Sequence, residues 1–98
     1  MGWILLAVVV VAIWFVVSEA LANAGKHSGA TRVIVRAGRE HGGPVRAEVV
    51  DDGHGGADPA GEGLAGLRAR VEALDGTLTV TSPEGGPTVI RAEFPCGS

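Results

Sequence analysis

Several residue types that binding sites and secreted folds depend on are scarce in this sequence. Of 98 residues, one is cysteine, none is tyrosine, two are tryptophan and two are phenylalanine. The single cysteine, Cys96, can form neither an internal disulfide nor a thiolate zinc site, which excludes a disulfide-stabilised secreted fold. So few aromatic side chains also leave little for the stacking of nucleic-acid bases.

Charge is sparse as well, and it is slightly acidic. Eight lysines and arginines against eleven aspartates and glutamates give a net charge of −3. A nucleic-acid-binding domain needs a basic face to meet phosphates, so we expect no nucleic-acid partner. The histidines, at positions 27, 41 and 54, lack the spacing of metal ligands. Because 46% of the residues are hydrophobic, the chain has the composition of one small folded domain.

An apolar run, WILLAVVVVAIWFVV, occupies residues 3–17. As a helix it reaches roughly 23 Å, less than the ~30 Å of a bilayer core. It lacks a basic flank before it, although Ala22-Asn23-Ala24 resembles a signal cleavage site. Three interpretations stay open: a long helix that continues to residue 27 and packs on a sheet, a membrane or interfacial anchor, and a cleaved signal.

Patterns of periodicity further along the chain predict the remaining elements. Alternation of apolar and polar residues predicts strands at 31–37, 45–50, 77–82 and 88–94, and apolar residues at helical spacing predict a helix from 63, with Gly76 as its left-handed cap. The glycine-rich link at 38–44 predicts an antiparallel hairpin. The order of elements favours an α/β (α+β) two-layer sandwich, with helices on one face of a mostly antiparallel four-stranded sheet.

Two polar clusters are not required by packing. The first, on the helix that follows the apolar run, consists of Glu19, Asn23, Lys26 and His27. An amide oxygen can bind Mg²⁺, a lysine can meet phosphate, and a carboxylate can orient or deprotonate a nucleophile. The simpler interpretation of this cluster is a solvated helix face.

The second cluster follows the strand at 45–50. Asp51 ends the strand, where a carboxylate can accept a hydrogen bond from an exocyclic amine such as that of adenine. Further glycines allow close approach of the backbone and surround a helix start, where free N–H groups favour phosphate; they are Gly53, Gly55, Gly61, Gly63 and Gly66.

Taken together, the clusters resemble the motifs of a known family. SEALANAGKH (18–27) is similar to the N box, DDGHG (51–55) to the G1 box, and GEGLAGL (61–67) to the G2 box of the histidine kinase, gyrase and Hsp90-like ATP-binding (Bergerat-type) fold. The likeness is greatest to the catalytic ATP-binding domain of sensor histidine kinases of the nitrate-sensor type. It covers residues 13–96, with residues 1–12 as an apolar extension continuous with the first helix.

The resemblance implies a role for each candidate residue. Asp51 would bind the adenine amine, Gly53 and Gly55 would shape that wall of the pocket, and Thr88 would support it from the last strand. Asn23 would hold Mg²⁺. The positions expected to approach the phosphates, or to form the lid over them, are Lys26, His27, Gly61, Gly63 and Leu64. Glu19 resembles the glutamate that activates water in ATPase relatives, and in a kinase it would position the γ-phosphate or the incoming histidine.

The function implied is that of a histidine protein kinase-like phosphotransferase using ATP and Mg²⁺. Its partners would be a dimerisation and histidine phosphotransfer domain and, indirectly, a response regulator. We expect a cytoplasmic location, with contact to the membrane face through residues 3–17 as an option. None of the three histidines lies in a phospho-acceptor motif, so we expect an isolated or truncated catalytic domain that cannot autophosphorylate. The alternatives are an anti-sigma-factor-type serine kinase, a stand-alone ATPase, and a non-functional gene remnant.

Overall fold

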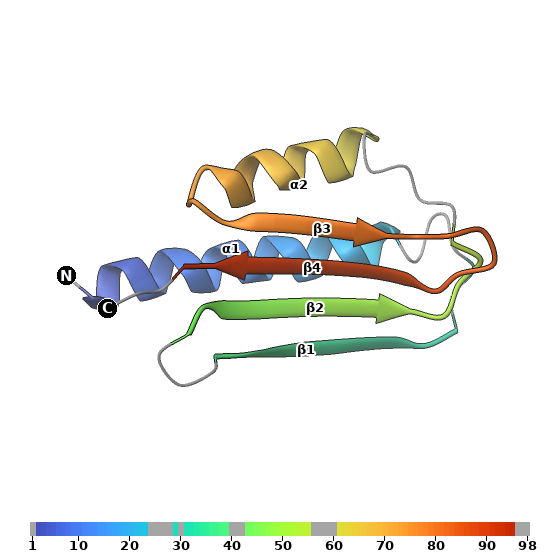
Figure 1. Cartoon of the computed structure of the whole chain (residues 1–98), viewed down its shortest axis with the longest axis horizontal. Helices are drawn as coiled ribbons and strands as arrows, with labels where there is room; N and C mark the ends of the chain where they lie inside the picture. Colours follow the sequence, from blue (N-terminus) through green and yellow to red (C-terminus); the bar gives the residue numbers. More distant parts are fainter. Residues whose placement is uncertain (1, 24–28, 30, 40–42, 56–60, 96–98) are drawn as a thin grey trace.

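The computed structural model describes residues 2–23, 29, 31–39, 43–55 and 61–95. Its elements are α1 (Gly2–Asn23), β1 (Val33–Arg39), β2 (Val45–Asp51), α2 (Glu62–Glu72), β3 (Thr77–Thr81) and β4 (Thr88–Phe94). The four strands form one sheet in the order β1-β2-β4-β3, and all neighbours are antiparallel. Both helices pack on the same face of this sheet (Figure 1). The predicted two-layer fold is therefore confirmed.

Strand register explains how the sheet presents one apolar face to the helices. Two rows of paired residues cross the sheet on that side, Val35–Val49–Ile90–Val80 and Ala37–Ala47–Ala92–Leu78. Ile90, Ala92 and Phe94 are almost fully buried, together with Leu67 and Val71 of α2. Burying a Val, Leu, Ile or Phe side chain stabilises the fold by about 1.5–3 kcal/mol.

The apolar run lies within one 22-residue helix, α1. Val9, Ala12, Val16 and Ala20 recur at helical spacing and are buried against the rest of the domain. Other apolar residues of the same helix remain exposed, among them Trp14, at 64%. Within the described residues, no helix meets the length and hydropathy needed to cross a membrane.

The hairpin of β1 and β2 differs at its edges from the prediction. β1 begins at Val33 instead of Thr31 and continues through Gly38 to Arg39, because Gly38 pairs with Arg46 and Arg39 with Val45. Residues 31 and 32 are held by a side chain of another segment, described below. β4 occupies the predicted residues 88–94.

The predicted left-handed cap at Gly76 is wrong. The residue with positive φ after α2 is Asp75, at 60°, a conformation that aspartate adopts more readily than most residues. Gly76 is required for a different reason. A Cβ at that position would lie 2.8 Å from Val71 Cγ1 and 2.9 Å from Phe94 Cδ1. The glycine thus allows the chain to pass close to the core.

Candidate functional site

Asp51 and Thr88 are paired across β2 and β4 at one end of the sheet. Both are buried, with 2% and 1% of their surface exposed, and among the described residues they are the only buried polar side chains. In Figure 1 the C-terminal end of α1 and the start of α2 lie at this same end of the sheet. Most of the candidate residues are therefore gathered in one region.

The Asp51 carboxylate is only partly satisfied by the protein. Its Oδ1 accepts a hydrogen bond of 2.9 Å from the backbone N–H of Gly53. Its Oδ2 has no hydrogen bond with any described residue. A buried carboxylate oxygen without a partner is costly, and an N–H donor of a ligand would relieve that cost. The exocyclic amine of a base is one such donor.

Thr88 is joined to a residue that the sequence did not single out. Its Oγ1 lies 2.6 Å from Ser82 Oγ, across the turn between β3 and β4. The pairing follows from the register, because Thr81 and Val89 are the adjacent cross-strand partners. A hairpin drawn between the predicted strands would have placed Ser82 opposite Thr88. The two hydroxyls fix the wall of the site next to Asp51.

The glycines of the G1-like stretch pack against the turn between β3 and β4. Gly55 has a φ of +74°, and a Cβ built there would be 1.8 Å from the carbonyl oxygen of Pro83. Gly86, also at positive φ, would place a Cβ 2.0 Å from the carbonyl oxygen of Gly53. These glycines allow two backbone segments to touch, and Gly86 was missed because such long-range contacts leave no local signal.

Glu19 reaches from α1 to the first turn of α2. A Cβ added to Gly63 would lie 2.5 Å from Glu19 Oε2, so the carboxylate rests against this turn. The N-cap residue of α2 is Gly61, and no side chain caps the helix. A carboxylate near a helix N-terminus is stabilised by the helix dipole. Leu64 is buried in the core, so only its backbone can face a ligand.

The structure leaves part of the predicted phosphate end undescribed. Asn23 is the last residue of α1, and its side chain lies outside the described part, as do Lys26 and His27. Among the residues that are described, no three of His, Cys, Asp and Glu gather into a metal site. The roles of Asn23, Lys26 and His27 remain predictions.

Asp52 anchors the chain that enters β1. Its Oδ1 accepts hydrogen bonds from the backbone N–H groups of Thr31 (2.8 Å) and Arg32 (2.9 Å), and its Oδ2 lies 2.8 Å from the Thr31 hydroxyl. The hydrogen bond from the N–H of Arg32 is the main cause that holds the pKa of the Asp52 carboxyl below its usual value, and the hydrogen bonds from the hydroxyl and the N–H of Thr31 act in the same direction. Asp52 therefore fixes the point where the segment after α1 enters the sheet.

Because this pKa is lowered in the folded state, the anchor stabilises the fold above the usual aspartate pKa of about 3.9, and its contribution is lost as the pH falls below that value. We expect Asp52→Ala to melt below the wild type at about pH 7 and the difference to shrink toward about pH 3. Thermal melts across this range measure it. A difference that stays constant with pH would contradict the charge-dependent part of the anchor.

A buried carboxylate at a strand end and a glycine-surrounded helix start are typical of nucleotide-binding α+β domains. Residues 9–98 match the family described as histidine kinase-, DNA gyrase B- and HSP90-like ATPase. The chain therefore belongs to this family. It is an ATP-binding catalytic domain of the sensor histidine kinase type.

Individual relatives agree with this assignment. The chain is 36% identical over 83 residues to the nitrate/nitrite sensor protein NarQ of Escherichia coli (strain K12), a match that covers 81% of the chain and 15% of NarQ. Its structure is similar to the histidine kinase domain of the Erythrobacter litoralis EL346 blue-light activated histidine kinase, with a TM-score of 0.73 and 30% identity over 87% of this chain and 43% of that one.

A more distant solved structure shares the fold. It is the Acinetobacter baumannii histidine kinase AdeS, with a TM-score of 0.73 at 21% identity over 89% of this chain and 47% of that chain. In each of these comparisons, this chain spans less than half of the relative's length.

Proposed function

We propose that this chain binds Mg-ATP and supplies its γ-phosphoryl group to a histidine on another domain or chain. The observation that carries the proposal is the buried Asp51 carboxylate, with Oδ2 free of any described partner at the end of β2. The family supports the use of ATP. Residues 13–96 form the nucleotide-binding domain in this proposal, and residues 1–12 extend its first helix. We place its activity in the cytoplasm, where ATP is present.

At the end of the site that holds the base, the Asp51 carboxylate accepts a hydrogen bond from the adenine amine, and the N–H of Gly53 orients this carboxylate. The paired hydroxyls of Ser82 and Thr88 hold the adjoining wall. The close packing of Gly53 and Gly55 on the turn at Gly86 keeps the loop in place. Because Asp51, Gly53 and Thr88 are buried, and all of these groups are held by contacts within the chain before the ligand arrives, little ordering is needed on binding.

At the phosphate end, we assign the tail of the nucleotide to the region between the end of α1 and the start of α2. The uncapped N–H groups at Gly61, Gly63 and Leu64 suit an anion. Asn23 would hold Mg²⁺, with Lys26 and His27 approaching the phosphates. When bound, Mg²⁺ neutralises charge on the transferring phosphoryl group. Glu19 positions the γ-phosphate or the incoming histidine.

This proposal is tested with the purified full chain. We expect titration calorimetry to show ATP binding that is stronger with Mg²⁺ than without it. Mixed with a separately produced helical domain that carries an acceptor histidine, the chain should transfer label from γ-labelled ATP to form acid-labile phosphohistidine. The same reaction with the acceptor histidine changed to glutamine is the control.

The outcomes separate the alternatives. Acid-stable phosphoserine on a partner would replace the histidine kinase assignment with a serine kinase, and phosphate release without any acceptor would indicate an ATPase. No binding of ATP, with or without Mg²⁺, by the folded chain would overturn the proposal.

A further inference from the structure

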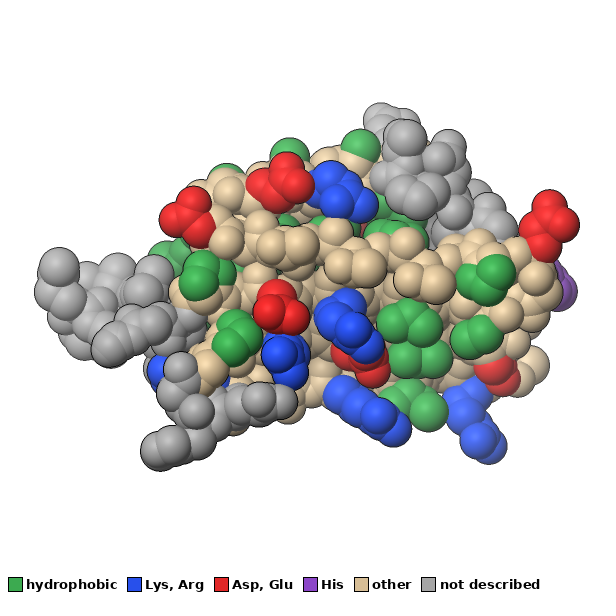
Figure 2. Space-filling model, in the orientation of Figure 1, with side chains coloured by type: hydrophobic (Ala, Val, Ile, Leu, Met, Phe, Trp, Pro, Cys, Tyr) green, Lys and Arg blue, Asp and Glu red, His purple; other side chains and the backbone are tan. Residues whose placement is uncertain are grey.

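The face of the sheet turned away from the helices carries an excess of arginine. An open hollow of about 560 Å³ on this part of the molecule is lined by Arg36, Arg46, Glu48, Arg91 and Glu93, which share this face, and by backbone and small residues of β1. Arg39, at the end of β1, also borders it, although it pairs with the buried Val45 and so belongs to the helix side of the strand. Figure 2 shows arginine or lysine side chains and acidic side chains gathered on this face of the molecule. The face is locally positive, whereas the chain as a whole has a net charge of −3.

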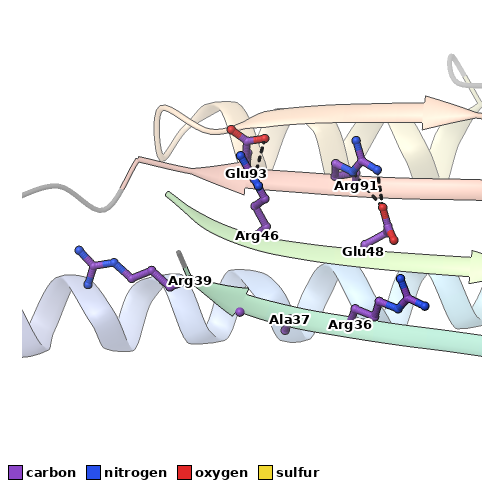
Figure 3. A pocket seen from close by; sticks show the side chains of 8 residues that line it. Arg36, Ala37, Arg39, Arg46, Glu48, Arg91 and Glu93 are labelled. Atoms are coloured by element: carbon purple, nitrogen blue, oxygen red, sulfur yellow. Dashed lines mark hydrogen bonds and ion pairs between the residues drawn. The ribbon is translucent and has the colours of Figure 1, made fainter. Parts of the chain in front are cut away.

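Two ion pairs neutralise part of this positive charge. Arg46 Nε lies 3.2 Å from Glu93 Oε2, and Arg91 Nε donates to Glu48 Oε2 at 3.0 Å (Figure 3). Arg36, on the outer strand, has no ion pair or side-chain hydrogen bond with a described residue, and it is exposed. Both glutamates are therefore engaged, while at least one arginine is available to a carboxylate from outside.

An apolar row lies directly beside the charged one. Ile34, Val50 and Val89 are cross-strand neighbours, one row along from Arg36, Glu48 and Arg91. Ile34 is 42% exposed, and Val50 and Val89 are half-buried. No described helix covers this row, because α1 and α2 both pack on the opposite face. The face thus combines an apolar strip with a flank of guanidinium groups.

We infer that this face binds an amphipathic helix of a partner protein whose apolar stripe is flanked by carboxylates. Neighbouring strands lie ~4.8 Å apart, close to the ~4.5 Å rise between helix residues i and i+3. A helix lying across the strands can therefore place successive apolar side chains over Ile34, Val50 and Val89. Carboxylates about two turns apart on its flank, ~10 Å, match Arg36 and Arg91, which are two strands apart.

Charge complementarity favours such a helix over a lipid surface, a nucleic acid or a second copy of this chain. Glu48 and Glu93 stand among the arginines and would repel the continuous negative charge of a lipid surface or a nucleic acid. A second copy of the same face would offer only those two glutamates, both already paired. Separate carboxylates next to apolar side chains avoid both problems.

The test uses the full chain and a synthetic helical peptide of about 18 residues, with leucines on one stripe and glutamates on its flank. We expect binding that shifts the amide resonances of Ile34, Val50 and Val89. Arg36→Glu should weaken it about tenfold, and Glu48→Gln should strengthen it about threefold by releasing Arg91 from its ion pair. Arg70→Glu, the same charge reversal on α2, is the control; Arg70 is exposed but its guanidinium lies over the Phe15 ring at 4.5 Å, so a thermal melt of this variant accompanies the binding measurement.

Several results would overturn the inference. One is equal binding of a peptide with glutamine in place of glutamate; another is equal weakening by Arg36→Glu and Arg70→Glu. If the chain bound phosphatidylglycerol vesicles more tightly than the peptide, and Arg36→Glu abolished this, the face would be assigned to a membrane. If the changes seen on adding the peptide came from dissociation of a dimer of the chain, the face would be assigned to self-association. Nucleotide affinity, measured in the same samples, should not change with Arg36→Glu, so failure here leaves the proposed function untouched.

Discussion

Gly55→Ala is expected to destabilise the domain by roughly 2–5 kcal/mol and to lower its melting temperature by about 10–30 °C. Two costs add. The backbone at Gly55 has a φ of +74°, which an L-residue adopts with strain, and the new methyl group would overlap the carbonyl oxygen of Pro83. For a domain of this size the sum is a large share of the total stability. Thermal and urea unfolding measure it.

Substitutions at two other glycines separate the cost of backbone strain from the cost of steric overlap. Gly85 also has positive φ, at +89°, but its Cβ would meet open space, so Gly85→Ala should cost only the strain, about 1 kcal/mol. Gly38 in β1 has neither positive φ nor a neighbour within 4 Å, so Gly38→Ala should be neutral. If all three variants unfolded alike, the contact between the glycine loop and the turn would not be what fixes Gly55.

The sequence predicts the fold class and the strand positions because both are written in local periodicity. Alternation along residues 88–94 identified β4, and the hairpin of β1 and β2 was found with edges shifted by two residues or fewer. The edges shifted because cross-strand pairing, as between Gly38 and Arg46, extends a strand through a residue that locally favours a turn.

Features that depend on strand order could not be predicted in this way. Arg46 faces Glu93 and Arg91 faces Glu48 only because β4 lies between β2 and β3. Tertiary contacts also decide that Asp75, and not Gly76, is the residue in the left-handed conformation. Gly76 is needed where the chain passes Val71 and Phe94, and a dipeptide pattern carries no information about that contact.

The candidate site divides along the same line. Asp51, Gly53 and Gly55 form a compact motif with a recognisable spacing, and they lie together in the fold. Ser82 and Gly86 belong to a turn far along the chain, and only the fold brings them to the site. The role of Asp52 was also hidden, because its partners Thr31 and Arg32 precede it by about twenty residues.

Asp51→Asn is expected to lower the affinity for ATP by about 100-fold with little change in stability. The amide retains an oxygen that can accept from the N–H of Gly53, so the fold keeps its hydrogen bond. Its NH₂ group, however, would meet the adenine amine, donor against donor, where the carboxylate accepts. Glu84→Gln, the same change of carboxylate to amide in the exposed turn between β3 and β4, should bind ATP as the parent does.

The affinity for inosine triphosphate tests whether Asp51 acts on the base of the nucleotide. It carries an oxygen where adenine carries the amine, so the parent chain should bind it about 100-fold more weakly than ATP, since a buried acceptor would be left facing an acceptor. In Asp51→Asn the amide can donate to that oxygen, and the discrimination should fall below about tenfold. Competition titrations of both nucleotides against both chains give the four affinities. If the parent and the variant discriminated equally, Asp51 would not contact the base, because its effect on ATP binding would then be independent of the group at that position.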